Sequence, residues 1–160
     1  MKTTDTTFLS EARDYVLANR DEGVICPCCD QNAQTYRVGM SSSMAVALIT
    51  IANMSELKSD GTYPWIYIPN VPECLKLAGA WAKIRYFDTL IEEAPKERPD
   101  GGHAGWWRIS TEGMRFVRAG TTIPKFVFLY NGEKLGQSDE RVTIKDALGK
   151  KFDLRELLNG

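Results

Sequence analysis

Hydrophobic residues recur at helical spacing in two long segments of the first third of the chain. In residues 8–19 they lie three or four positions apart, which predicts an amphipathic helix. Residues 41–57 carry a denser pattern that begins with serines whose hydroxyls can cap the first turn. Because this second helix is apolar on most of its sides, we expect it at the centre of the fold.

Shorter elements follow, separated by prolines and glycines. The aromatic and β-branched stretch 62–69 predicts a strand, and residues 70–78 predict a short helix with Pro72 in its first turn. Gly79 supplies a turn before a second predicted helix over residues 80–93, and two helices joined in this way form a helix-turn-helix. On that helix the predicted buried residues are Ala80, Ile84, Phe87 and Ile91, and the exposed polar ones are Lys83, Arg85, Tyr86 and Thr89.

The rest of the chain predicts more short elements. A polar loop over 95–105 precedes a strand over 106–110, where Trp106 and Trp107 must point to opposite faces, so one of them is expected in the core. The dipeptide Asn131-Gly132 is the strongest hairpin signal in the chain. The remaining predicted elements are a helix over 111–118, a hairpin over 125–136, a strand running into a turn over 141–148, and a helix over 153–158 capped by Asp153.

The element order over residues 41–118 resembles that of the winged helix-turn-helix superfamily. The closest likeness is the stretch from Asp88 to Gly113, DTLIEEAPKERPDGGHAGWWRISTEG, which is similar to the wing of MarR-like regulators. In that pattern an apolar pair precedes an acidic residue, and a charged loop and a strand lead to a helix that starts with a Thr-Glu-x-Gly-like motif. Here Leu90-Ile91-Glu92 and Thr111-Glu112-Gly113 stand at the two ends of the pattern. The whole chain also resembles small uncharacterised bacteriophage proteins.

The resemblance implies an α+β fold with a winged helix-turn-helix core. That core is expected at residues 41–120, after an N-terminal helix and cysteine-rich turn at 1–40. A C-terminal β-hairpin extension is expected at 121–160.

A winged helix implies a DNA-binding regulatory protein with double-stranded DNA as its partner. Its second helix would read the major groove through Lys83, Arg85, Tyr86 and Thr89. Three loop residues, Lys96, Arg98 and His103, would approach the backbone or the minor groove. The alternative is a winged-helix module that binds and modulates another protein, because the fold alone does not fix function.

Charge and motifs limit the other classes of function. The net charge of −1 gives no independent support for nucleic-acid binding. The sequence contains no Gly-rich phosphate loop after a strand, no His-Glu-x-x-His and no Gly-x-Ser-x-Gly, so we predict no enzyme. A thiol oxidoreductase is the third class considered, because of the cysteines described next.

Three of the four cysteines, Cys26, Cys28 and Cys29, lie in the stretch VICPCCD. Cys26 and Cys29 have the spacing with which two thiolates bind one zinc ion, but no second pair follows. A structural zinc ion could be held by Cys26, Cys28 and Cys29 with a distant fourth ligand, for which Cys74 and His103 are the remaining candidates, or by a site shared across a dimer. A redox pair, or reduced thiols with no shared role, are the other interpretations.

Length and composition are those of a globular protein. The 160 residues suggest one domain, and 43% of them are hydrophobic. No apolar run is long enough for a membrane helix, and the first seven residues are polar, so we expect a cytoplasmic protein without a membrane partner, which can form a homodimer.

Overall fold

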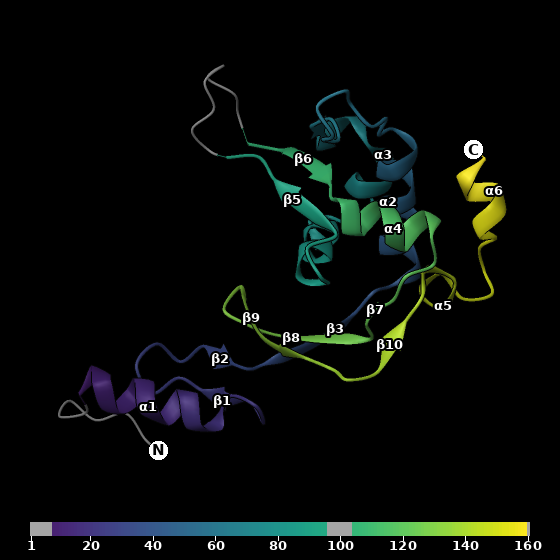
Figure 1. Ribbon diagram of the computed structural model, residues 1–160. Coiled ribbons are helices and arrows are strands. Elements are labelled where there is room, and N and C mark those ends of the chain that lie inside the picture. The colour runs from purple at the N-terminus through teal and green to yellow at the C-terminus, as the bar shows by residue number, and fades with distance from the viewer. Residues whose placement is uncertain (1–7, 96–103, 160) are drawn as a thin grey trace. The chain divides into compact units, whose positions relative to one another are not determined.

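The computed structural model describes residues 8–95 and 104–159, which form a mixed α+β structure of two compact units. The N-terminal unit comprises residues 1–38 and 127–137, and the main unit comprises residues 39–126 and 138–160. Figure 1 labels the helices and strands along the chain. The α+β class agrees with the expectation from the sequence.

The N-terminal unit combines one helix with short strands. Its helix α1 (Leu9–Asn19) is followed by β1 (Val24–Ile25) and β2 (Asn32–Ala33), which pair antiparallel on either side of the cysteine turn. A second sheet has the order β3-β8-β9, with β3 at Tyr36–Gly39, β8 at Phe126–Tyr130 and β9 at Glu133–Gln137. The predicted first helix and the predicted hairpin are both confirmed.

The hairpin between β8 and β9 turns at Asn131-Gly132, as the sequence predicts. Both residues have left-handed backbone angles, with φ of +50° at Asn131 and +77° at Gly132. Asn and Gly adopt these angles more readily than other residues, and they suit the tight turns that join twisted strands.

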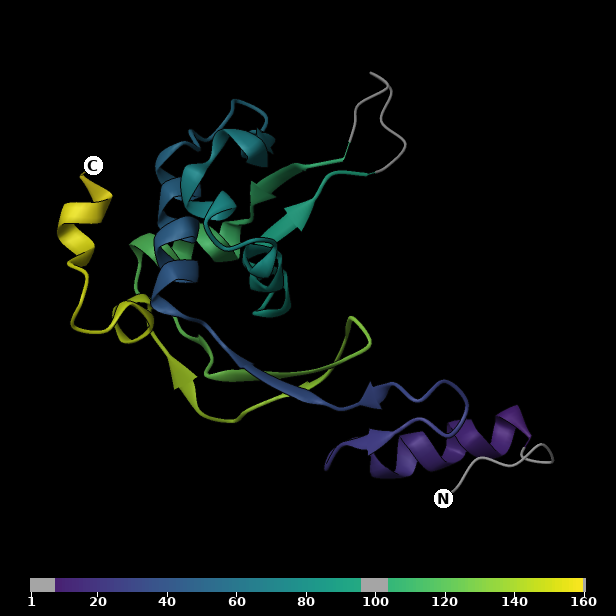
Figure 2. The ribbon, with the colours of Figure 1, turned by 180° about the vertical axis from the view of Figure 1, so that it is seen from behind.

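The central helix of the main unit is α2 (Ser42–Asn53), whose buried side chains make up much of the core. The hydroxyl of Ser41 accepts the backbone N–H of Met44 at 3.1 Å and caps the first turn. Helix α2 contacts α3, α4, α5, α6 and η2, and it lies beside α4 in both views of the ribbon (Figures 1 and 2). Its central position confirms the expectation from its apolar surface.

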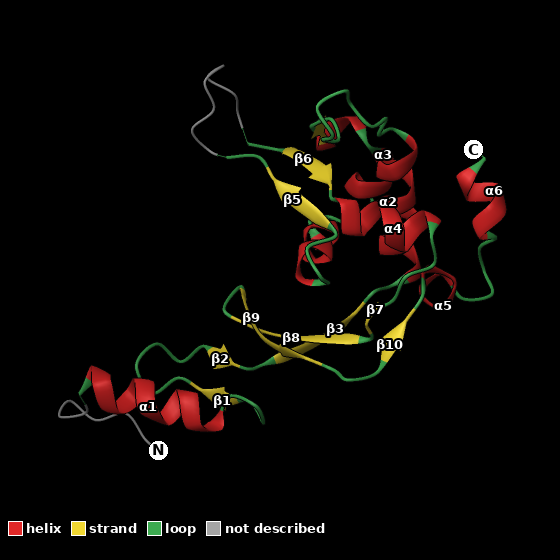
Figure 3. Ribbon diagram, in the orientation of Figure 1, coloured by secondary structure: helices red, strands yellow, loops and turns green. Residues whose placement is uncertain are grey.

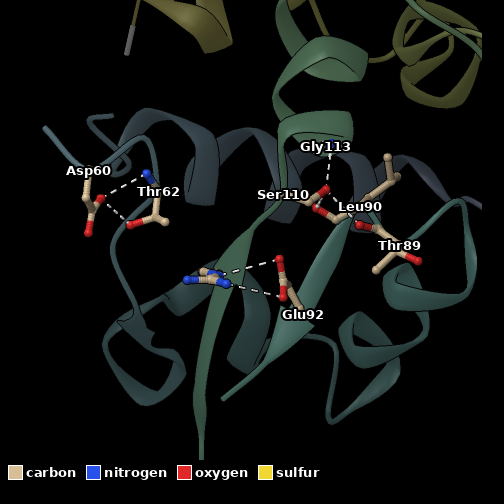
Figure 4. Close-up of polar contacts among 8 residues, drawn as sticks. Asp60, Thr62, Thr89, Leu90, Glu92, Ser110 and Gly113 are labelled. Carbon is tan, nitrogen blue, oxygen red and sulfur yellow. Dashed lines mark hydrogen bonds and ion pairs between the residues drawn. The ribbon is translucent and has the colours of Figure 1, made fainter. Parts of the chain in front are cut away.

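Helix α2 ends at Asn53, four residues before the predicted end at Leu57. The hydroxyl of Ser55 donates to the carbonyl of Ile51 at 2.6 Å. The carboxylate of Asp60 then accepts both the N–H and the hydroxyl of Thr62, which forms a turn and lowers the pKa of Asp60 (Figure 4). Side chains that bond nearby backbone in this way compete with helix continuation.

A three-stranded antiparallel sheet of the order β4-β6-β5 packs with these helices. Its strands β5 and β6 are labelled in Figure 3. Its strands are β4 (Ile66–Tyr67), β5 (Ile91–Glu93) and β6 (Trp106–Ile109). Between β4 and β5 the chain forms η1 (Ile68–Asn70), α3 (Pro72–Leu75) and η2 (Ala80–Tyr86).

The predicted helix over 80–93 is wrong in kind and in length. Its first half, η2, is a 3₁₀ helix, and Phe87 already has an extended backbone. Asp88 and Thr89 then have positive φ angles of 50° and 54°, which turn the chain into β5. Strand β5 pairs Ile91 with Ile109, and this contact between distant residues outweighs the local helical pattern.

The burial predicted for that segment is nevertheless mostly right. Ile84, Phe87 and Ile91 have no exposed surface, whereas Ala80 is only partly buried. The same apolar residues reach the core through a tight helix, a turn and a strand.

The chain after β6 forms helix α4 (Thr111–Arg118), which confirms the predicted helix, and then β7 (Ile123–Pro124). Strand β7 pairs with β10 (Arg141–Val142). The segment 141–148, predicted as a strand running into a turn, is a strand over these two residues. Thr143 and Asp146 form a reciprocal capping box that starts helix α5 (Ile144–Leu148) and lowers the pKa of Asp146. Helix α6 (Leu154–Leu158), capped by Asp153, confirms the last predicted helix.

Within residues 8–95 and 104–159, no helix combines the length and the apolar character that a membrane span requires.

Candidate nucleic-acid interface

The exposed side of η2 carries the first two residues predicted to contact DNA. Lys83 and Arg85 are exposed, while Ile84 between them is fully buried in the core of the main unit. Gly79 precedes η2 with a φ of +93°, so it makes the turn that the sequence predicted between the two helices. The buried isoleucine therefore fixes which side of η2 faces solvent.

Arg85 joins η2 to strand β5. Its Nη1 lies 3.7 Å from Glu93 Oε2, and its Nη2 donates to the hydroxyl of Tyr86 at 3.0 Å. The guanidinium carbon also lies 5.6 Å from the ring centroid of Trp107. Because the Arg85 side chain is still 41% exposed, its charge remains open to a ligand but is partly neutralised by Glu93.

Tyr86 and Thr89 occupy different surroundings from those predicted. Tyr86 is partly buried at the end of η2, and Thr89 lies in the left-handed turn that follows rather than on a helix. The carbonyl of Thr89 accepts the hydroxyl of Ser110 at 2.7 Å, which ties the turn to the start of α4 (Figure 4). Thr89 is exposed, so its side chain stays accessible.

An ion pair holds the same turn from its other side. Arg141 Nη2 lies 2.8 Å from Asp88 Oδ2 and also donates to the carbonyl of Thr122 at 2.7 Å. Left-handed angles are unfavourable for residues other than glycine, and contacts of this kind keep such a conformation in place.

A second arginine lies on the sheet, and the sequence did not single it out. Arg108 on β6 pairs with Glu92 on β5 through N···O distances of 3.4 and 3.5 Å (the pair drawn in Figure 4). Its guanidinium carbon lies 4.2 Å above the ring of Trp65, a cation–π distance. The signal was the alternation in Trp106-Trp107-Arg108-Ile109, which places Trp106 and Arg108 on one face of the strand.

The other face of β6 is core. Trp107 is 5% exposed and packs edge-on against Trp81, with 4.9 Å between the ring centroids. Trp106 is partly exposed and lies 5.1 Å from the ring of Tyr67. This division confirms the expectation that one of the two neighbouring tryptophans is core.

Ion pairs within the protein neutralise part of the positive charge near η2 and the sheet. Arg85 and Arg108 each have a glutamate partner, whereas Lys83 makes no ion pair with any residue that the structure describes. The predicted loop residues Lys96, Arg98 and His103 lie outside the described residues. The side of the sheet that carries η2 can therefore offer the Lys83 ammonium group and the partly neutralised Arg85 guanidinium to an anionic ligand, whereas Arg108 lies on the opposite face of β6.

The predicted cysteine ligands are divided between the two units. Cys26 is partly buried and Cys28 and Cys29 are exposed in the turn between β1 and β2, whereas Cys74 on α3 is fully buried in the core of the main unit. Burial raises the pKa of the Cys74 thiol to about 12, with a smaller effect from Glu73. Among the described residues, no three His, Cys, Asp or Glu side chains are grouped so that they could hold a metal ion.

Comparisons with protein-family models, with curated proteins and with solved structures found no match to this chain.

Proposed function

We propose that the main unit is a winged-helix module that binds double-stranded DNA and that the protein acts as a DNA-binding regulator. The contact surface would be η2 together with the hairpin of β5 and β6. Lys83 and Arg85 would contact phosphates or base edges, and Thr89 would lie beside them.

The observation that carries this proposal is the connection order of the main unit. One helix, α2, precedes strand β4, and three short helical segments, η1, α3 and η2, come before a β-hairpin. The last strand of that hairpin, β6, lies between β4 and β5. A winged helix-turn-helix has this order of elements, with the hairpin as its wing.

The chemistry of the surface supports phosphate binding more than base reading. A 3₁₀ helix of seven residues offers a shorter rod to the major groove than the predicted α-helix. Ammonium and guanidinium groups that bind phosphates give an affinity that falls steeply with salt. We therefore expect binding with modest sequence preference and strong dependence on ionic strength.

Fluorescence anisotropy with a labelled mixed-sequence duplex at low salt tests the proposal. Lys83→Ala should weaken binding several-fold and should reduce the slope of log affinity against log salt by about one. Lys145→Ala, which removes an exposed lysine of α5 instead, is the matched control and should change neither quantity. Absence of binding by the unsubstituted protein, or an equal loss in both variants, would refute the proposed surface.

The two arginine–glutamate pairs favour a second candidate, a winged-helix module that binds another protein. A paired charge such as that of Arg108 and Glu92, beside the ring of Trp65, is less suited to a polyanion than a free cation is. Arginine and tryptophan are also the residues that most often dominate protein interfaces. A photo-crosslinking residue in place of Trp65 distinguishes the two candidates, because cross-links to a protein and not to duplex DNA would support the second.

A further inference from the structure

The turn between β1 and β2 arranges two of its three cysteines around one sulfur atom. The backbone N–H groups of Cys28 and Cys29 donate to the Cys26 sulfur, and so does the Cys29 thiol. These contacts lower the pKa of Cys26, and the two backbone N–H groups contribute most to the shift. Cys26 and Cys29 lie in one turn at the spacing with which two cysteines bind a single zinc ion.

The backbone of the turn is itself well fixed. The N–H of Cys26 donates to the carbonyl of Gln31 at 2.8 Å, and the N–H of Asp30 donates to the carbonyl of Cys26 at 3.0 Å. Asp30 has a φ of +59°, which closes the turn, and Pro27 is buried beneath it. The main chain at Cys26 is therefore held on both sides by hydrogen bonds within the turn.

Cys26 and Cys29 also share an open space that Cys28 does not reach. Both of them line a hollow of about 360 Å³ on the N-terminal unit, which Tyr130 and Asn131 border as well. Cys28 does not belong to that lining. Cys26 and Cys29, the two cysteines at the spacing that suits one zinc ion, therefore border the same hollow, and Cys28 does not.

Two thiolates are half of a closed zinc site. Structural zinc takes four ligands in a tetrahedron, and no group of three ligands exists among the described residues of one chain. The fourth cysteine, Cys74, has no exposed surface. A second copy of the chain, related by a two-fold axis, brings an identical pair and completes four sulfur ligands.

The N-terminal unit has only a small hydrophobic core among its described residues. Among its described residues the buried apolar side chains are few: Ala12, Val16, Pro27, Val127 and Leu129. By contrast, it exposes several large apolar side chains, namely Phe8, Leu9, Leu17, Ile25, Tyr36 and Leu135. Units of this size commonly gain stability from a metal ion or from association, and exposed apolar side chains favour association.

We infer that the N-terminal unit dimerises around one zinc ion held by Cys26 and Cys29 of two copies of this chain. Binding converts the four thiols to four thiolates and releases the corresponding protons to solvent. This inference goes beyond the proposed function and does not depend on it.

The full-length reduced protein, stripped of metal with a chelator, tests the inference by titration with Co²⁺ and then Zn²⁺. Sulfur-to-cobalt charge-transfer and strong ligand-field absorption should saturate at one ion for two chains. Light scattering after size-exclusion chromatography should show the mass doubling from 18.0 kDa on addition of Zn²⁺ and returning with a chelator. Neither measurement requires a substitution.

Substitutions then identify the ligands. Cys26→Ser and Cys29→Ser should each abolish the charge-transfer band and the change of mass, whereas Cys28→Ser, the matched control, should keep both. Circular dichroism of each variant shows whether the main unit remains folded. The inference is overturned by an absence of binding, by one ion per monomer, or by loss of binding in Cys28→Ser.

Discussion

Gly113 shows at the scale of one residue how tightly the main unit is built. A Cβ atom at this position would lie 2.2 Å from the carbonyl oxygen of Leu90 and 2.6 Å from Cγ1 of Ile109. The first of these atoms belongs to the backbone, so it cannot move aside as a flexible side chain could. The hydroxyl of Ser110 links the same groups, because it donates to the Leu90 carbonyl and accepts the N–H of Gly113 (Figure 4).

Gly113→Ala should therefore destabilise the main unit by about 3 kcal/mol, the upper end of the usual cost of overpacking. Urea unfolding followed by circular dichroism measures the change. The control is Gly136→Ala, where a Cβ would meet nothing within 4 Å, and a change below about 0.5 kcal/mol is expected there. Equal effects of the two substitutions would contradict the close approach at Leu90.

The raised pKa of Cys74 leads to a second prediction at the residue scale, on how stability depends on pH. The pKa of this thiol is about 12 in the folded protein because of burial, against 9.0 for an unperturbed cysteine. Its contribution to stability is complete below pH 9 and is lost as the pH rises toward 12, because the unfolded chain releases the proton first.

The free energy of unfolding should thus fall more steeply between pH 9 and 11 in the unsubstituted protein than in Cys74→Ala. Urea unfolding at several pH values measures the two slopes, and the variant corrects for lysines and tyrosines that titrate in the same range. Identical slopes would mean that the thiol does not resist ionisation.

At the scale of elements, the segment from η2 to β6 shows how far the sequence determines structure. The apolar positions Ile84, Phe87 and Ile91 are compatible with one helix and are buried as predicted, so the pattern located the core. The local pattern could not show that Ile91 pairs with Ile109, because that hydrogen-bonded contact joins residues far apart in sequence. Pairing with β6 decided the secondary structure, and the left-handed turn at Asp88 and Thr89 follows from it.

Buried and partly exposed side chains alternate along strand β6, which leads to a prediction for its two tryptophans. Trp107→Ala should destabilise the main unit by about 3–5 kcal/mol, because the side chain is core and packs on Trp81. Trp106→Ala, the neighbour on the outer face, should cost clearly less, since its ring is partly exposed. Thermal unfolding of the two variants compares them, and a larger loss in Trp106→Ala would reverse the assignment of the faces.

At the scale of the whole molecule, the chain forms two units that are not continuous in sequence. Residues 127–137 belong with the first 38 residues rather than with the chain on either side of them. The hairpin signal at Asn131-Gly132 predicted the local structure, but nothing local indicates that β8 pairs with β3. The candidate site could be predicted only in part for the same reason. Lys83 and Arg85 were visible in the sequence, whereas the pairing of Arg85 with Glu93, and of Arg108 with Glu92 and Trp65, depends on the sheet.

The central claim is that the surface of η2 and β5 binds DNA, and its charge pairing offers the most direct test. The affinity for a mixed-sequence duplex at low salt is measured for the unsubstituted protein, Arg85→Ala and Glu93→Gln. Glu93→Gln removes a negative charge and frees a guanidinium that lies 3.7 Å from the carboxylate, so this variant should bind several-fold more tightly. Arg85→Ala should bind several-fold more weakly. If Glu93→Gln leaves the affinity unchanged or lowers it while the protein remains folded, the proposed DNA-binding surface is wrong.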